Sequence, residues 1–163
     1  MARWSANETS ITTSAVADTT NFTDTTYMAL QGGSSTQYIK LLEVYLGGLA
    51  TSSAPSIMLV AHDSTVGATL SVGRFVALDP ASAALAAPPT CFDTATTKPQ
   101  RSSTLSLLNL GYNAFGGIVR WNAAPGQEPA MLGNTASLGE ISVSAFTGST
   151  AAAMTTHFIV EPM

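Results

Sequence analysis

The apolar runs of this chain are short, and turn-forming residues interrupt them at intervals of about eight to twelve residues. Runs rich in Val, Ile, Leu, Tyr and Phe alternate with clusters of Gly, Pro, Ser, Thr and Asn, a pattern typical of strands joined by tight turns. We therefore predict an all-β protein, an antiparallel β-sandwich that is jelly-roll-like, with about ten strands. The predicted strands span residues 27–30, 37–46, 56–61, 65–70, 74–78, 90–95, 103–110, 116–121, 129–132, 140–146 and 152–161.

The strongest strand pattern, residues 37–46, is apolar at both alternating sets of positions. Leu42, Val44 and Leu46 form one set. Ile39, Leu41 and Tyr45 form the other, and successive side chains of a strand point to opposite faces. A strand that is apolar on both faces is expected at the centre of a sandwich or at a subunit interface.

Two segments depart from the strand pattern. Residues 1–26 are rich in Thr, Ser and Asn, and we expect an extended N-terminal arm there, with room for one strand, followed by a β-sandwich domain over residues 27–163. Four isolated apolar residues of this arm are candidates for anchoring it on a neighbouring subunit, and a frayed terminus is the alternative. They are Trp4, Ile11, Val16 and Phe22. One short helix is expected over residues 79–88, where Asp79 can cap, Pro80 suits the first helical position and Pro88-Pro89 ends it.

Charge is scarce in this chain. Only 10% of the 163 residues are charged, the net charge is −4, and residues 44–62, 102–119 and 141–160 carry no charged side chain. A small monomer usually has more charge on its surface, so we expect much of this surface to be covered by copies of the chain or by a larger assembly. The six basic residues are scattered, which argues against direct nucleic-acid binding.

The cellular context follows from features at the level of the whole chain. Cys91 is the only cysteine, which excludes a disulfide framework and a zinc site made of several cysteines. The first residues lack the apolar run of a secretory signal, and no apolar tract reaches the roughly 20 residues of a membrane helix. We therefore expect synthesis in a reducing cytoplasm and no membrane partner.

No group of residues has the pattern of a catalytic or metal site. His62-Asp63-Ser64 are adjacent on an expected strand end, where neighbours point to opposite sides, so they do not make a triad by themselves. Five carboxylates are candidates for an acid/base pair, but nothing in the sequence pairs them. They are Asp63, Asp79, Asp93, Glu128 and Glu140. No metal-ligand or phosphate-loop motif is present, so we expect no enzyme activity and no cofactor.

Three aromatic residues lie close together in the sequence. Tyr112, Phe115 and Trp121 are candidates for core or interface packing. Their alternative role is a sugar-stacking platform on a sandwich face, which would make the chain a carbohydrate-binding module.

Two segments carry a family resemblance. They read Leu-Asp-Pro-Ala-Ser at residues 78–82 and Tyr-Asn-Ala-Phe-Gly-Gly-Ile-Val-Arg-Trp-Asn-Ala-Ala-Pro-Gly-Gln-Glu at residues 112–128. Leu-Gly-Glu-Ile-Ser at residues 138–142 and a final strand follow. This order resembles small virion structural proteins of tailed bacteriophages, in particular head decoration (cement) proteins. The resemblance covers residues from about 27 to the C-terminus and does not include the arm.

The resemblance implies a β-sandwich protein, often a homotrimer, that is made in the host cytoplasm and binds the major capsid protein on the outer surface of the virion. Such a protein braces the shell and has neither enzyme activity nor a cofactor. Another virion component, such as a tail, neck or fibre-associated β domain, is the nearest alternative.

Overall fold

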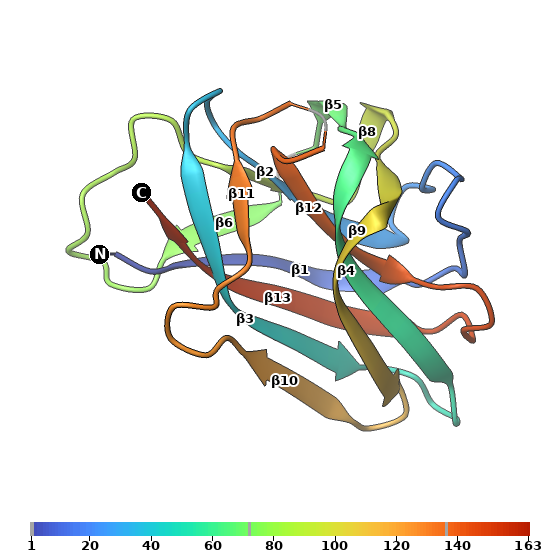
Figure 1. Ribbon diagram of the computed structural model, residues 1–163. Helices are drawn as coiled ribbons and strands as arrows, with labels where there is room; N and C mark the ends of the chain where they lie inside the picture. Colours follow the sequence, from blue (N-terminus) through green and yellow to red (C-terminus); the bar gives the residue numbers. More distant parts are fainter. Residues whose placement is uncertain (1, 72, 136) are drawn as a thin grey trace.

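The fold was analysed in a computed structural model that describes residues 2–71, 73–135 and 137–163 (Figure 1). These residues form strands and no helix. The strands are β1 (Trp4–Thr12), β2 (Tyr27–Gln31), β3 (Tyr38–Gly48), β4 (Pro55–Thr65), β5 (Ala68–Leu70), β6 (Arg74–Ala77), β7 (Thr90–Phe92), β8 (Ala95–Thr97), β9 (Gln100–Asn113), β10 (Ile118–Asn122), β11 (Ala130–Leu132), β12 (Glu140–Ala145) and β13 (Ala153–Pro162).

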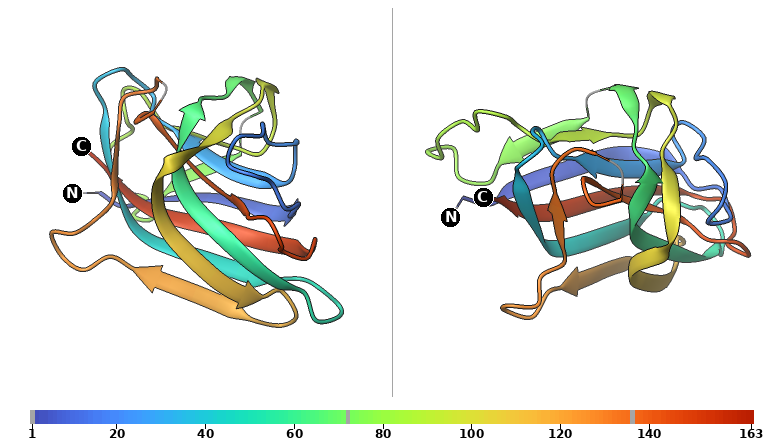
Figure 2. Two further views of the ribbon diagram at one scale, coloured as in Figure 1. Left: turned by 45° about the vertical axis from the view of Figure 1, so that its right-hand side comes forward. Right: turned by 45° about the horizontal axis from the view of Figure 1, so that its top comes forward.

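The strands make two facing sheets and one small ribbon (Figures 1 and 2). The larger sheet has the order β10-β3-β13-β1-β6, with β11 also paired to β3. The smaller sheet has the order β7-β2-β12-β4-β9, and β5 pairs with β8 alone. Every strand pair is antiparallel. The predicted antiparallel β-sandwich is therefore confirmed.

The order in which the chain visits the two sheets is that of a jelly roll. β1, β3, β10 and β13 lie together in the larger sheet, and β2, β4, β9 and β12 lie together in the smaller one. The first and last strands of the chain are neighbours, and successive strands mostly alternate between the sheets. This arrangement is the double-sheet jelly roll of eight strands, here with β5 to β8 inserted between β4 and β9.

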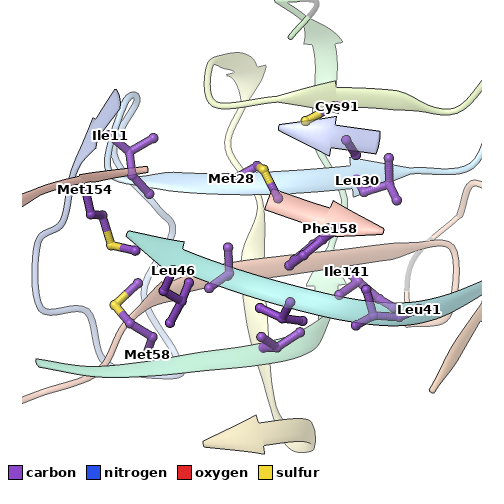
Figure 3. Close-up of a cluster of buried hydrophobic side chains, with 14 of the residues drawn as sticks. Ile11, Met28, Leu30, Leu41, Leu46, Met58, Cys91, Ile141, Met154 and Phe158 are labelled. Atoms are coloured by element: carbon purple, nitrogen blue, oxygen red, sulfur yellow. The ribbon is translucent and has the colours of Figure 1, made fainter. Parts of the chain in front are cut away.

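The main core fills the space between the sheets (Figure 3). Met28 and Leu30 of β2 point toward the larger sheet, and Leu46 of β3 and Phe158 of β13 point back toward them. Every one of these side chains is at most 1% exposed. Alternation along each strand places these residues on the inner faces, as expected for two aligned sheets that share a core.

The structure corrects the prediction of a separate arm over residues 1–26. β1 lies inside the larger sheet, paired with β13 on one edge and β6 on the other. Trp4, Ala6 and Ile11 point into the core, and an extra residue between Glu8 and Ile11 restores the inward position of Ile11. The segment looked like an arm because the outward residues of a half-buried strand are polar and its inward residue Ala6 is small.

The remainder of the predicted arm, residues 13–26, covers the outer face of the smaller sheet. Val16 and Phe22 pack there on Tyr27 and Ala29 of β2 and on Phe92 of β7, which makes a second apolar cluster. The backbone of this segment is bonded to the sandwich, for example from the Val16 amide to the Ala145 carbonyl at 3.2 Å. Residues 1–26 and 27–163 therefore do not form separate units.

The expected two-faced strand at residues 37–46 has a different explanation. Val160 of β13 lies opposite Leu41, whereas the preceding Ile159 lies opposite Glu43, so Leu42 is an extra residue in β3. This β-bulge reverses the alternation. Ile39, Leu41, Val44 and Leu46 consequently all point into the core and are at most 2% exposed. The strand is apolar at both alternating sets because the bulge brings them onto one face.

The short helix expected over residues 79–88 is absent, and a turn occupies its start. Asp79 accepts a hydrogen bond from the Ala81 amide through its side chain at 2.9 Å and from the Ser82 amide through its carbonyl at 3.0 Å. Asp79 therefore stabilises a turn and does not cap a helix. A segment this short is marginal as a helix without a packed face, and its alanines are largely exposed.

Candidate assembly surface

The four apolar residues expected to anchor an arm on a neighbour are buried in their own chain. Trp4 stacks on Phe75 with ring centroids 5.1 Å apart, and it belongs with Ile11 to the main core. Val16 and Phe22 belong to the second cluster, on the outer face of the smaller sheet. None of the four is more than 9% exposed, so in this conformation they offer no surface to a second subunit.

The three aromatic residues from the second half of the chain are not gathered into a platform. Tyr112 of β9 is 9% exposed and belongs to the main core, and Trp121 of β10 packs against that core from the other sheet. Phe115 lies in the connection between these strands and is 57% exposed. Of the seven predicted interface residues, Phe115 alone presents a large surface.

The residues considered for catalysis do not come together in one site, and only one pair of them interacts. His62 and Asp63 are buried and Ser64 is exposed, with its hydroxyl donating to the Gln100 carbonyl, so the three do not form a triad. Asp79 caps its turn, and Glu128 lies 3.5 Å from Lys40. That pair is Asp63 and Glu140, which lie on neighbouring strands β4 and β12 and interact directly.

The Asp63–Glu140 pair is buried on the outer face of the smaller sheet, beneath the segments that cover it. Neither side chain is exposed. Glu140 Oε2 accepts hydrogen bonds from Gln31 Nε2 at 2.9 Å and from the Gly67 amide at 3.0 Å. Ser142 donates its hydroxyl to Asp63 Oδ1 at 2.6 Å. Glu140 therefore has the donors that an ionised carboxylate needs.

Burial raises the pKa of both carboxyls. It raises the pKa of Glu140 to about 7. Burial, followed by the charge of Glu140, raises the pKa of Asp63 well above its ordinary value. Asp63 Oδ2 is buried, and no N–H or hydroxyl of the described residues donates to it, which favours the protonated form of Asp63. Two adjacent buried carboxyls ionise together only at high energetic cost.

This pair was not predicted, and its arrangement limits its chemistry. A pair of carboxyls that cleaves a glycoside flanks a cleft open to the sugar, whereas these two are covered by protein. The signal in the sequence was Glu140 and Ser142 on the polar side of an alternating strand. That side looked solvent-exposed because the sequence did not reveal that residues 13–26 and 66–71 cover it.

A second buried ionic group fastens the 13–26 segment. Arg101 of β9 is 1% exposed, and its Nε donates to Asp18 Oδ1 at 2.7 Å while Nη2 donates to the Val16 carbonyl at 2.8 Å. Its Nη1 donates to Ser144 of β12. The guanidinium also lies over the rings of Phe22 and Phe146. One side chain thus ties the segment to two strands of the sheet.

The described residues contain no group of three or more His, Cys, Asp and Glu side chains placed to hold a metal ion. Within the same residues, no helix has the length and apolar character required to cross a membrane.

Several charges lie on the outer face of the larger sheet. Arg120 of β10 donates to Glu43 of β3 at 2.7 Å and lies over the ring of Tyr45, 5.2 Å from its centroid. Tyr45 also donates its hydroxyl to Glu43 at 2.5 Å and stacks on His157 of β13. These charges are paired with one another and create a polar face.

One end of the sandwich is built from uncharged stretches of the chain. We call residues 48–57, 111–118 and 146–153 the charge-free end, because none of these three stretches contains a charged residue. They are bonded to one another: the Ala50 amide donates to the Ala114 carbonyl at 3.0 Å, and the Thr150 amide donates to the Pro55 carbonyl at 3.0 Å. The chain termini lie at the opposite end of the molecule (Figure 2).

The charge-free end carries large apolar side chains that face solvent. Leu49 is 51% exposed, Ile57 45%, Phe115 57% and Ile118 79%. A hollow of about 340 Å³ lies beside Ile57, lined by Pro55, Ser56, Ile57, Gly111, Tyr112 and Gly148. Large exposed apolar side chains on stretches without charge are typical of a surface that another protein covers.

Comparisons with models of protein families, with curated proteins and with solved structures found no match for this chain.

Proposed function

We propose that this protein is a non-enzymatic structural subunit that decorates and stabilises the outer surface of a phage capsid. The observation that carries the proposal is the charge-free end, whose three stretches contain no charged residue and expose four large apolar side chains. Placing this surface against a shell protein removes apolar area from water without stripping water from any charge.

The rest of the molecule suits a bracing role. The jelly roll has its termini at the end opposite the charge-free end (Figure 2), so contacts at the charge-free end do not involve them. The outer face of the larger sheet is polar, with Arg120 and Glu43 paired on it, and suits exposure to solvent. A rigid block that binds across joints between capsid subunits adds buried area to those joints and raises the shell's resistance to internal pressure.

The test uses shells assembled from the major capsid protein of the source virus without this chain. Added protein is expected to sediment with the shells in a saturable way and to raise their melting temperature. Phe115→Ser with Ile118→Ser is expected to weaken binding strongly, because both side chains belong to the proposed contact and are exposed in the free protein.

The matched control is Val76→Ser with Leu78→Ser. These residues are 57% and 52% exposed and lie at the β6 end of the larger sheet, away from the charge-free end, so binding is expected to stay unchanged. Absence of sedimentation with shells, or equal loss of binding in both double variants, contradicts the proposal.

A further inference from the structure

One edge of the smaller sheet is left without a partner. β9 is the last strand of this sheet and pairs with β4 on one side. Among the described residues, no strand pairs with its other side. β9 has 14 residues, more than any other described strand, so it presents the longest row of backbone amides and carbonyls that no strand satisfies.

Part of this edge lacks the features that usually protect an exposed strand. Natural sheet edges are kept apart by charged side chains, by proline, by β-bulges or by being short. The bulges in the pairing of β9 lie before Leu108, and the stretch from Leu108 to Asn113 is regular. β6 has 4 residues and includes Arg74, β10 has 5 and includes Arg120, and β7 has only 3. Between Ser102 and Asn113, β9 contains neither a charged residue nor a proline.

The side chains along this edge leave apolar surface at the rim of the core. The pairing of β9 with β4 is regular from Leu108 to Asn113, whereas the register shifts before it. Leu108 and Leu110 lie opposite Val60 and Met58 and pack against the main core, but both remain partly exposed because no strand lies beyond them. Asn109 and Gly111 point to the outer face.

We infer that the free edge of β9 pairs with the same edge of a second copy of this chain, antiparallel and about a two-fold axis. Such pairing satisfies the free backbone groups of both copies and joins the two smaller sheets into one continuous sheet. A two-fold axis perpendicular to the sheet keeps both cores on one side, so the leucines of the two copies meet across the seam.

The absence of charge makes a second copy of this chain a suitable partner. A two-fold contact uses the same edge of both copies, so an edge with charges of one sign would repel its own copy. β9 carries no charge over the regular stretch and therefore pairs with itself without repulsion. A basic or acidic partner strand would find no complementary charge there. The inference does not depend on the capsid, since it concerns the free protein.

The test is the molar mass of the purified protein in solution over a broad range of concentrations. The expected value is twice the chain mass of 16.7 kDa, which is 33.4 kDa. Ser106→Lys with Asn109→Lys replaces two exposed side chains of β9 and puts four lysines into the seam of the pair. This variant is expected to have the mass of one chain at concentrations where the wild type is a dimer.

The matched control is Thr96→Lys with Asn122→Lys, which adds the same charge at exposed positions of β8 and β10. It is expected to remain a dimer, and the thermal unfolding of both variants establishes that they are folded. A wild type that is monomeric throughout, a dimer that survives the lysines in β9, or a trimer of three chains overturns the inference. These outcomes concern self-association and do not decide whether the protein binds shells. Loss of shell binding by the Phe115 and Ile118 double variant would likewise not decide whether β9 pairs with a second copy.

Discussion

At the scale of single residues, burial raises the pKa values of the Asp63 and Glu140 carboxyls and so makes stability depend on pH. The pKa of each carboxyl is higher in the folded protein than in the unfolded chain, because burial disfavours ionisation of both and the charge of Glu140 further disfavours ionisation of Asp63. The folded state therefore keeps protons that the unfolded state releases as the pH rises above about 4. By linkage, the pair's contribution to stability is fully present below the ordinary carboxyl pKa and is lost as the pH rises toward the folded values.

Asp63→Asn tests this prediction. The amide keeps the shape of the side chain and donates to Glu140, but it removes one titrating group from the pair. Wild-type protein is expected to lose about 2–3 kcal/mol of unfolding free energy between roughly pH 5 and pH 8, and the variant much less. Thermal unfolding followed by circular dichroism across this range measures both slopes. Asp79→Asn, at an exposed turn, is the control, and a variant slope equal to the wild-type slope refutes the prediction.

Arg101 is the second residue whose environment predicts a measurable effect. Arg101→Met leaves the Val16 carbonyl and the Ser144 hydroxyl without their donor and is expected to cost about 3 kcal/mol, as for a broken buried ion pair. Lys98→Met removes a half-exposed ion pair with Asp24 on the same segment and is expected to cost under about 1 kcal/mol. Denaturant unfolding measures the loss of unfolding free energy in both variants. Similar losses would show that Arg101 is not the main residue that holds the 13–26 segment on the sheet.

At the scale of elements, β1 is the feature that most changes the interpretation of the chain. A flexible arm tolerates substitution along its length, whereas a strand inside a sheet tolerates it only on the outward side. Ala6 is fully buried between Phe158 and Phe75 of the flanking strands, and its neighbour Asn7 points outward. The first twelve residues are therefore expected to contribute to folding of the whole sandwich.

Ala6→Asp and Asn7→Asp form a matched pair for this prediction. Ala6→Asp puts an unpaired carboxylate into the core and is expected to cost about 4 kcal/mol or to prevent folding. Asn7→Asp places the same group on the outer face and is expected to change stability by less than about 1 kcal/mol. Soluble expression and thermal unfolding measure both, and equal tolerance of the two changes would favour a detached arm.

At the scale of the whole molecule, the distribution of charge sets how the protein responds to salt. The three stretches of the charge-free end and the β9 edge from Ser102 to Asn113 contain no charged residue, so their contacts are driven by apolar burial and backbone hydrogen bonds. Raising salt from roughly 0.1 M to 1 M shortens the Debye length from about 10 Å to 3 Å. Both self-association and shell binding are expected to be unchanged or stronger, as measured by sedimentation. A steep fall with salt would point instead to the charged face around Arg120 and Glu43.

The sequence by itself determined the fold class and most strand positions. Turn residues and alternating side chains are local signals, and they placed β2, β3, β4, β10, β11, β12 and β13 within a few residues of their observed bounds. Charge is also a property of sequence alone, and the uncharged stretches predicted a covered surface. The helix expected after Asp79 does not form, and the side chain of Asp79 instead accepts a hydrogen bond within a turn.

Only the tertiary structure decided which polar residues are buried and which apolar residues are exposed. The bulge at Leu42, the central position of β1 and the cover that residues 13–26 provide over Asp63 and Glu140 all depend on partners distant in the sequence. A single strand has two faces, and its own residues do not reveal whether another segment covers the polar one. The tertiary structure shows that the four residues expected to contact a neighbour are buried in their own chain, and that β9 has an unpaired edge.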